Sequence, residues 1–211
     1  MTGEARDAED PPVVAYQGEP GAFSEQAVLE LWEDAVVALP CESFAEVTRA
    51  VAEGRARFGA LPVENTIAGP VREAQAALAA SGLAAVGETA LAIRLCLLAL
   101  PGAALAEVRV VESHPVALRQ CAQWIAARPW LTPREGYDTA GAARAVAASG
   151  DRTRAAVASA RAGALAGLAV LAEGIEDRAG NVTRFTIVAR EDAPLPSRAL
   201  ARGRAPANLE Q

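Results

Sequence analysis

The segment GNVTRFTIV, residues 180–188, joins a polar start to an apolar run near the end of the chain of 211 residues. The apolar run, residues 185–188, predicts a strand. Directly before it, Thr183 supplies a neutral hydrogen-bond donor and Arg184 a planar fork for a carboxylate. These groups at the start of a strand suit a small anionic substrate that loses an oxygen. An arginine that is merely solvated at a strand edge would give the same pattern.

Short apolar runs alternate with alanine-rich helical stretches upstream of this segment. Such alternation predicts an α/β fold. We expect strands at residues 13–16, 36–39, 58–63, 107–111, 155–158, 168–171 and 184–190, with residues 83–100 largely extended. We expect helices from Ser24, from a capping box of Ser43 and Glu46 to Gly54, from Thr66 to Leu78, at residues 115–125 and 139–148, and up to Gly167.

The order of these elements predicts two α/β lobes with a cleft between them. Residues 13–94 together with 172–190 would form the first lobe and residues 95–171 the second, so that the last strand returns to the first lobe. Small-molecule sites usually form in such clefts. The ends, residues 1–12 and 191–211, are charged or rich in proline, arginine and alanine, and we expect them to be disordered tails.

Composition excludes several classes of protein. A net charge of −6 and a pI near 5.0 leave no basic surface for nucleic acid. Three cysteines fit neither a disulfide framework nor a metal knuckle, and a single histidine excludes a histidine-rich metal site. The N-terminus is acidic, and the longest apolar run, residues 95–100, is far too short to cross a membrane. We therefore expect a cytoplasmic protein with no membrane or nucleic-acid partner.

Polar residues gather where predicted strands end and helices begin, the edge that carries the ligand in open α/β sheets. Residues 16–24 form a glycine-containing turn whose N–H groups could reach a ligand. Residues 64–66 place a carboxylate, an amide and a hydroxyl after a strand, and residues 113–120 and 138–139 begin further helices. A structural turn or a helix cap explains each cluster alone. Their number indicates a shared binding site.

These motifs, in this order, resemble the catalytic domain of prephenate dehydratase over residues 14–189. The family patterns are Tyr-x-Gly-x-x-Gly-[Thr/Ser]-Phe-Ser at residues 16–24, Pro-[Ile/Val]-Glu-Asn-[Ser/Thr] at 62–66, Ser-His-Pro-x-x-Leu-x-Gln-Cys at 113–121, Thr-Ala-x-Ala-Ala at 139–143 and Asn-x-Thr-Arg-Phe at 181–185. Five motifs in the family's order make the match specific.

The resemblance implies a two-lobed fold like that of type II periplasmic binding proteins, with prephenate in the cleft. It implies loss of CO2 and hydroxide to give phenylpyruvate on the route to phenylalanine, without a cofactor or a metal, in a homodimer. By this resemblance Thr183 assists departure of the ring hydroxyl, and Glu64 is the second catalytic candidate. The implied substrate-binding residues are Gly21, Ala22, Phe23, Asn65, Thr66, Ser113, His114, Gln120, Asn181, Arg184 and Phe185.

Three positions depart from the family pattern, and other functions stay open. Ala22, Leu95 and Val116 stand where the family usually has a Thr or Ser, a His and a Gln, which thins the polar lining of the cleft. The chain ends soon after the last strand, so we expect no regulatory ACT domain and no feedback control by phenylalanine. The open alternatives are an arogenate dehydratase, a prephenate decarboxylase, which lacks the family's usual threonine, and a protein that binds small carboxylates without reaction.

Overall fold

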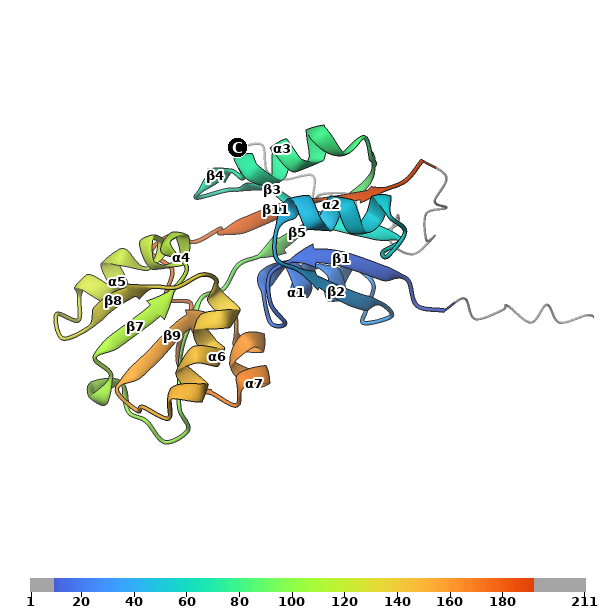
Figure 1. The fold of residues 1–211 in the computed structure, drawn as a ribbon. Helices are drawn as coiled ribbons and strands as arrows, with labels where there is room; N and C mark the ends of the chain where they lie inside the picture. The colour runs from blue at the N-terminus through green and yellow to red at the C-terminus, as the bar shows by residue number, and fades with distance from the viewer. Residues whose placement is uncertain (1–9, 192–211) are drawn as a thin grey trace, which may run out of the picture.

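The computed structural model describes residues 10–191, which form two mixed β-sheets flanked by helices (Figure 1). The first sheet has the strand order β2-β1-β3-β11-β5, with β4 paired to β3, and the second has the order β10-β6-β9-β7-β8. The first sheet consists of β1 Val13–Gln17, β2 Val37–Cys41, β3 Phe58–Asn65, β4 Gly69–Pro70, β5 Ala84–Ala92 and β11 Val182–Ala189. The second consists of β6 Cys96–Ala99, β7 Val110–Ser113, β8 Thr132–Glu135, β9 Arg154–Ala158 and β10 Ala169–Glu173. The predicted α/β fold class is confirmed.

Each sheet packs against its own helices. The helices of the first sheet are α1 Phe23–Leu31, α2 Phe44–Ala52 and α3 Arg72–Ser81. Those beside the second sheet are α4 Pro115–Gln120, α5 Ala122–Ala126, α6 Thr139–Ser149 and α7 Ala160–Ala166, with a short 3-10 turn at Leu105–Glu107. We call the first sheet with α1–α3 the first lobe, and the second sheet with α4–α7 the second lobe. The predicted tails lie outside the described residues, apart from residues 10–12 and 191.

The last strand, β11, lies in the middle of the first sheet, antiparallel to both β3 and β5. The chain therefore leaves the first lobe after β5, builds the second lobe from β6 to β10, and returns. The two connecting segments lie side by side. Ile93 N–H donates to the Asn181 carbonyl at 2.8 Å, and Ile175 N–H donates to the Leu95 carbonyl at 3.1 Å.

Buried apolar residues form a core that continues from one lobe to the other. One cluster joins Tyr16 and Phe58 of the first sheet to Leu98 of the second. Gly163 of α7 lies so close to this leucine that a Cβ built on the glycine would be 2.7 Å from Leu98 Cδ2. The alanine- and glycine-rich helices thus pack closely against their sheets, as the small side chains allow.

Some predicted boundaries in the first lobe are wrong. β3 continues to Asn65 and turns into β4, so that α3 begins at Arg72 and neither Asn65 nor Thr66 caps a helix. The turn forms because the Asn65 side-chain oxygen accepts hydrogen bonds from Ile67 N–H at 3.0 Å and Ala68 N–H at 2.8 Å, which is an Asx turn.

The predicted capping box of α2 is half formed. Ser43 Oγ accepts from Glu46 N–H at 3.2 Å and caps the helix. Glu46, however, accepts from the N–H of Glu42 at 2.9 Å and not from that of Ser43. The carboxylate therefore holds the residue one place before the N-cap.

In the second lobe the helix predicted at residues 115–125 is interrupted at Cys121, between α4 and α5. Asp177, from the connecting segment, accepts from the N–H groups of Gln123 at 2.9 Å and Trp124 at 3.1 Å, and so caps α5 from a remote position. The strand expected at residues 107–111 is shifted to β7. The sequence does not predict β8, because all its residues are exposed and Pro133 lies in this edge strand.

No helix within residues 10–191 is both long and apolar enough to span a membrane.

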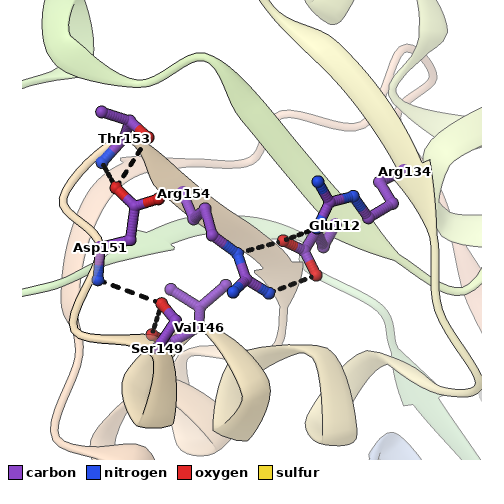
Figure 2. A network of polar contacts seen from close by, with 7 residues as sticks. All are labelled: Glu112, Arg134, Val146, Ser149, Asp151, Thr153 and Arg154. Carbon is purple, nitrogen blue, oxygen red and sulfur yellow. Dashed lines mark hydrogen bonds and ion pairs between the residues drawn. The ribbon is translucent and has the colours of Figure 1, made fainter.

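A buried carboxylate ties three strands of the second sheet together (Figure 2). Glu112 on β7 accepts from Arg154 Nε at 2.6 Å and Nη2 at 2.9 Å, and Arg134 Nη1 on β8 lies 3.4 Å away. The Glu112 side chain is 9% exposed and that of Arg154 is 22% exposed. A bidentate pair so little exposed is costly to break from one side, because the remaining charge stays without its partner.

We predict that Glu112→Ala lowers the free energy of unfolding by about 3 kcal/mol, because the Arg154 guanidinium is left uncompensated. Urea denaturation of the purified protein measures the change. The control is Glu53→Ala, which removes a carboxylate from the exposed pair with Arg55 and should have little effect. Equal effects of the two substitutions would contradict the structural role of Glu112.

Candidate active site

A cleft of about 770 Å³ lies between the lobes and is lined by residues of both. The predicted site residues that line it are Ala22, Phe23, Asn65, His114, Gln120, Thr183 and Phe185. The departures at Leu95 and Val116 line it too, so the cleft wall is apolar at these positions. Gly21, Glu64, Thr66, Ser113, Asn181 and Arg184 are not among the lining residues.

The polar centre of the cleft is the pairing of Thr183 with Asn65. The register of β11 against β3 places these two residues opposite each other, and both are buried. Asn65 Nδ2 donates to Thr183 Oγ1 at 3.0 Å, to Asn181 Oδ1 at 2.7 Å and to the Val182 carbonyl at 3.2 Å. The hydroxyl is therefore held by an amide from the neighbouring strand.

The orientation of this amide follows from the turn after β3. Asn65 Oδ1 already accepts from two backbone N–H groups, so the NH2 end must face Thr183. Because Thr183 Oγ1 accepts that hydrogen bond, its own proton is left for another acceptor. The arrangement presents Thr183 as a hydrogen-bond donor in the cleft.

Gln120 brings the second lobe into the same network. Its Nε2 donates to Asn65 Oδ1 at 3.4 Å, and its Oε1 accepts from Asn181 Nδ2 at 3.2 Å. Thr66 supports the network from outside, since its hydroxyl accepts from Val182 N–H at 2.9 Å and donates to the Gly180 carbonyl at 2.7 Å. Thr66 thus orients the segment before Thr183 and does not line the cleft.

Glu64 and Arg184, which were predicted to be a catalytic and a substrate-binding residue, do not line the cleft. Successive strand residues point to opposite faces, and Arg184 is exposed between the buried residues Thr183 and Phe185. Its Nη2 lies 2.8 Å from Glu64 Oε2, and its Nη1 lies 3.6 Å from Glu88 Oε1. The structure therefore assigns Arg184 and Glu64 to an ion-pair cluster outside the cleft. The alternation along β11 was the signal that could have shown this.

The two glycines of the turn at residues 16–24 do not offer their own N–H groups to a ligand. Gly21 N–H donates to Glu25 Oε2 at 2.8 Å, and Gly18 N–H donates to the Cys41 carbonyl at 3.0 Å. Gly21 has φ +95°, and a Cβ there would lie 2.8 Å from Ala162 Cα of α7. The glycine is therefore required by the close approach of the second lobe.

Polar contacts between the lobes surround this turn. Ser159 Oγ donates to the Gly21 carbonyl at 2.8 Å, and Arg161 Nε lies 2.9 Å from Glu25 Oε2. At the cleft, Tyr137 Oη donates to the Glu42 carbonyl at 2.8 Å, and both residues line the cavity. These pairs could not be predicted from the sequence, because their members are remote along the chain.

Ser113 and His114 have different surroundings although they are neighbours. Ser113 is fully buried and donates to the Val157 carbonyl at 2.5 Å, which makes it part of the second sheet. His114 caps α4 by accepting from Val116 N–H at Nδ1, at 3.2 Å, so the neutral ring carries its proton on Nε2. Burial, and then the positive charge of Arg119, lower the pKa of His114.

We predict that His114→Asn makes the protein less sensitive to acid. The pKa of His114 lies below its usual 6.5 in the folded protein, because the folded state disfavours the protonated ring. The contribution of His114 to the free energy of unfolding is therefore complete above pH 6.5 and is lost as the pH falls through the lowered pKa. Asparagine keeps a capping oxygen but does not titrate. We expect the free energy of unfolding to fall less in the variant than in the wild type when the pH is lowered from about 7.5 to about 5. A difference independent of pH would contradict this.

The cleft also contains two arginines that the sequence analysis missed, Arg72 at the start of α3 and Arg119 beside Gln120. Arg119 lies inside the motif at residues 113–121, at a position that the pattern leaves variable, and Arg72 lies beyond the end of the motif at residues 62–66. Within the described part of the chain no group of three or more His, Cys, Asp or Glu side chains is placed to hold a metal ion.

Comparison with known proteins matches residues 14–193 to the family model described as prephenate dehydratase. A bifunctional N-acyl-homoserine lactone acylase/prephenate dehydratase of Komagataeibacter europaeus is 41% identical over 87% of this chain and 65% of its own length. Arogenate dehydratase 1 of Petunia hybrida is 46% identical over 84% of this chain and 42% of its own. The chain thus spans about two thirds of the first relative and less than half of the second.

Solved structures agree with these matches. Prephenate dehydratase from Arthrobacter aurescens, in complex with L-Phe, has a TM-score of 0.80 at 28% identity and covers 88% of this chain and 63% of its own. A periplasmic substrate-binding protein from Coxiella burnetii has a TM-score of 0.51 at 14% identity, covering 92% of each chain, and shares the fold alone. The two-lobed type II fold expected from the sequence is confirmed. The chain belongs to the prephenate dehydratase family.

Proposed function

We propose that this protein converts prephenate to phenylpyruvate with loss of CO2 and water. The observation that carries the proposal is the Thr183 hydroxyl, held as a donor by Asn65 inside a cleft between two lobes. The matched family and the relatives named dehydratases support the same reaction. The proposal includes a homodimer in the cytoplasm, with residues 13–94 and 172–190 as one lobe and residues 95–171 as the other.

The reaction needs positioning more than strong acid or base. The bond between the ring and its carboxylate breaks, and its electron pair enters the ring. The C4–oxygen bond breaks at the same time, and the oxygen leaves as hydroxide, which takes a proton to become water. The ring becomes aromatic, which supplies much of the driving force. A preorganised donor to the departing oxygen then lowers the barrier.

In this proposal each cleft residue has a role that follows from its surroundings. Thr183 donates to the departing oxygen, and Asn65 orients Thr183. Gln120 and Asn181 hold the amide of Asn65, and His114 offers an Nε2 donor from the second lobe. Apolar walls come from Ala22, Phe23 and Phe185. Glu64 and Arg184 are left out of the chemistry, because they pair with each other away from the cleft.

The Komagataeibacter europaeus relative is also named an acylase, but the described residues of this chain do not support acyl transfer by a cysteine. The thiols of Cys41, Cys96 and Cys121 are buried. Burial raises the pKa of Cys41 to about 11 and that of Cys121 to about 12, and it also raises the pKa of Cys96. Thiols of this kind are not ionised at neutral pH and are poor nucleophiles.

Incubation with prephenate at neutral pH, followed by identification of the product, tests the proposal. Phenylpyruvate is the expected product, and a non-aromatic keto acid would indicate a decarboxylase. A parallel incubation with arogenate distinguishes the two dehydratases, since arogenate would give phenylalanine. Binding without any product would indicate a carboxylate-binding protein.

We predict that Thr183→Ala lowers kcat about 100-fold and changes KM little, because the lost hydrogen bond strengthens as the oxygen departs. The matched control is Thr186→Ala, which removes a hydroxyl from the same strand at a position that does not line the cleft. Steady-state kinetics of both variants measure the difference. A Thr183→Ala enzyme with most of the wild-type kcat would remove this hydroxyl from the mechanism.

A second prediction concerns the amide that holds this hydroxyl. Asn65→Asp replaces the NH2 group facing Thr183 by an oxygen, while the other oxygen can still accept from Ile67 and Ala68. Thr183 should then donate its proton to the new carboxylate and lose its role as donor to the substrate. We expect kcat to fall about as far as in Thr183→Ala, at least tenfold. Combining both substitutions should add little, and additive losses would show that the two residues act separately.

A further inference from the structure

The substrate of the proposed function is a dianion, and the cleft must therefore supply cations. This requirement rests on the proposed function, since both carboxylates belong to prephenate. The arginine expected to meet one of them, Arg184, is paired with Glu64 and Glu88 outside the cleft. The protein as a whole carries a net charge of −6, so no general positive field replaces it.

We propose that Arg72 and Arg119 bind the two carboxylates of the substrate, one from each lobe. Both residues line the cleft. Neither guanidinium makes a hydrogen bond or an ion pair with any residue between 10 and 191. A guanidinium in this state presents its whole fork to a carboxylate.

Arg72 belongs to the wall formed by the first lobe. It is the first residue of α3, and only Val71 separates it from the short strand β4, whose Gly69 pairs with Asn65 of β3. Gly69, Pro70 and Val71 line the cleft along with it. Arg72 therefore follows a hairpin that begins at the residue holding Thr183.

Arg119 belongs to the opposite wall. It lies in the last turn of α4 beside Gln120, whose amide reaches Asn65 Oδ1 across the cleft. The positive charge of Arg119 acts on a group that lines the cleft, because it contributes to the lowered pKa of His114. The two arginines thus flank the network around Thr183 from opposite sides.

The other arginines of the described residues do not compete for this role. Arg144, Arg154 and Arg161 are paired with carboxylates, while Arg49, Arg94 and Arg178 do not line the cleft. Three acidic residues, Glu42, Glu73 and Asp138, line the cleft as well. These three carboxylates already outnumber the two arginines, so loss of either arginine would enlarge the excess of negative charge facing the substrate, and each guanidinium should matter strongly for binding.

Arg72→Gln and Arg119→Gln in the full chain test the proposal by steady-state kinetics with prephenate. We expect each substitution to raise KM about tenfold with kcat within about twofold, because a charge-assisted hydrogen bond is lost equally from bound substrate and transition state. The double variant should raise KM about 100-fold. Lysine at either position should restore part of the loss, since it keeps the charge without the fork.

Arg49→Gln is the matched control, since Arg49 is exposed on α2 and outside the cleft; its KM should equal that of the wild type. A wild-type KM in Arg72→Gln or Arg119→Gln overturns the proposal for that residue, and so does a loss confined to kcat. A wild-type protein without turnover would count against the proposed function instead. In that event calorimetric titration with prephenate still decides about the arginines, because weaker binding to the variants supports their role and equal binding overturns it.

Discussion

The antiparallel pairing of β3 with β11 is the constraint on which the cleft depends. It sets Asn65 opposite Thr183, two residues that are far apart in the sequence. The Asx turn after β3 uses the oxygen of the Asn65 side chain and leaves its NH2 group for the hydroxyl. The Asx turn thus leaves the proton of the Thr183 hydroxyl free for a hydrogen bond to an acceptor in the cleft. The proposed reaction depends on this role of Thr183 as a hydrogen-bond donor.

The alternation of side chains along β11 separates two kinds of residue that the motif Thr-Arg-Phe presents together. Thr183 and Phe185 face the cleft, whereas Arg184 joins an ion-pair cluster on the other face of the sheet. A carboxylate ligand must then find its cations elsewhere. The cleft holds arginines on both walls, while other contacts between the lobes are made by neutral groups and by two ion pairs, Glu25 with Arg161 and Glu19 with Arg144.

Much of the fold could be predicted from the sequence, because short apolar runs alternating with helical stretches carry a local signal. The cleft residues Asn65, Gln120, Thr183 and Phe185 also came from local motifs. What could not be predicted depends on distant partners: the start of α3 is set by an Asx turn and the break before α5 by Asp177. The role of Gly21 was missed for the same reason, since only the approach of Ala162 explains it.

The position of β11 has a consequence for synthesis on the ribosome. The strands of the second sheet are consecutive along the chain, so this half can assemble as soon as β10 has emerged. β3 and β5 emerge much earlier, but the strand that pairs with both of them, β11, is synthesised last among the strands. During that interval both edges have unpaired backbone groups, which is the condition under which nascent chains associate wrongly or need a chaperone.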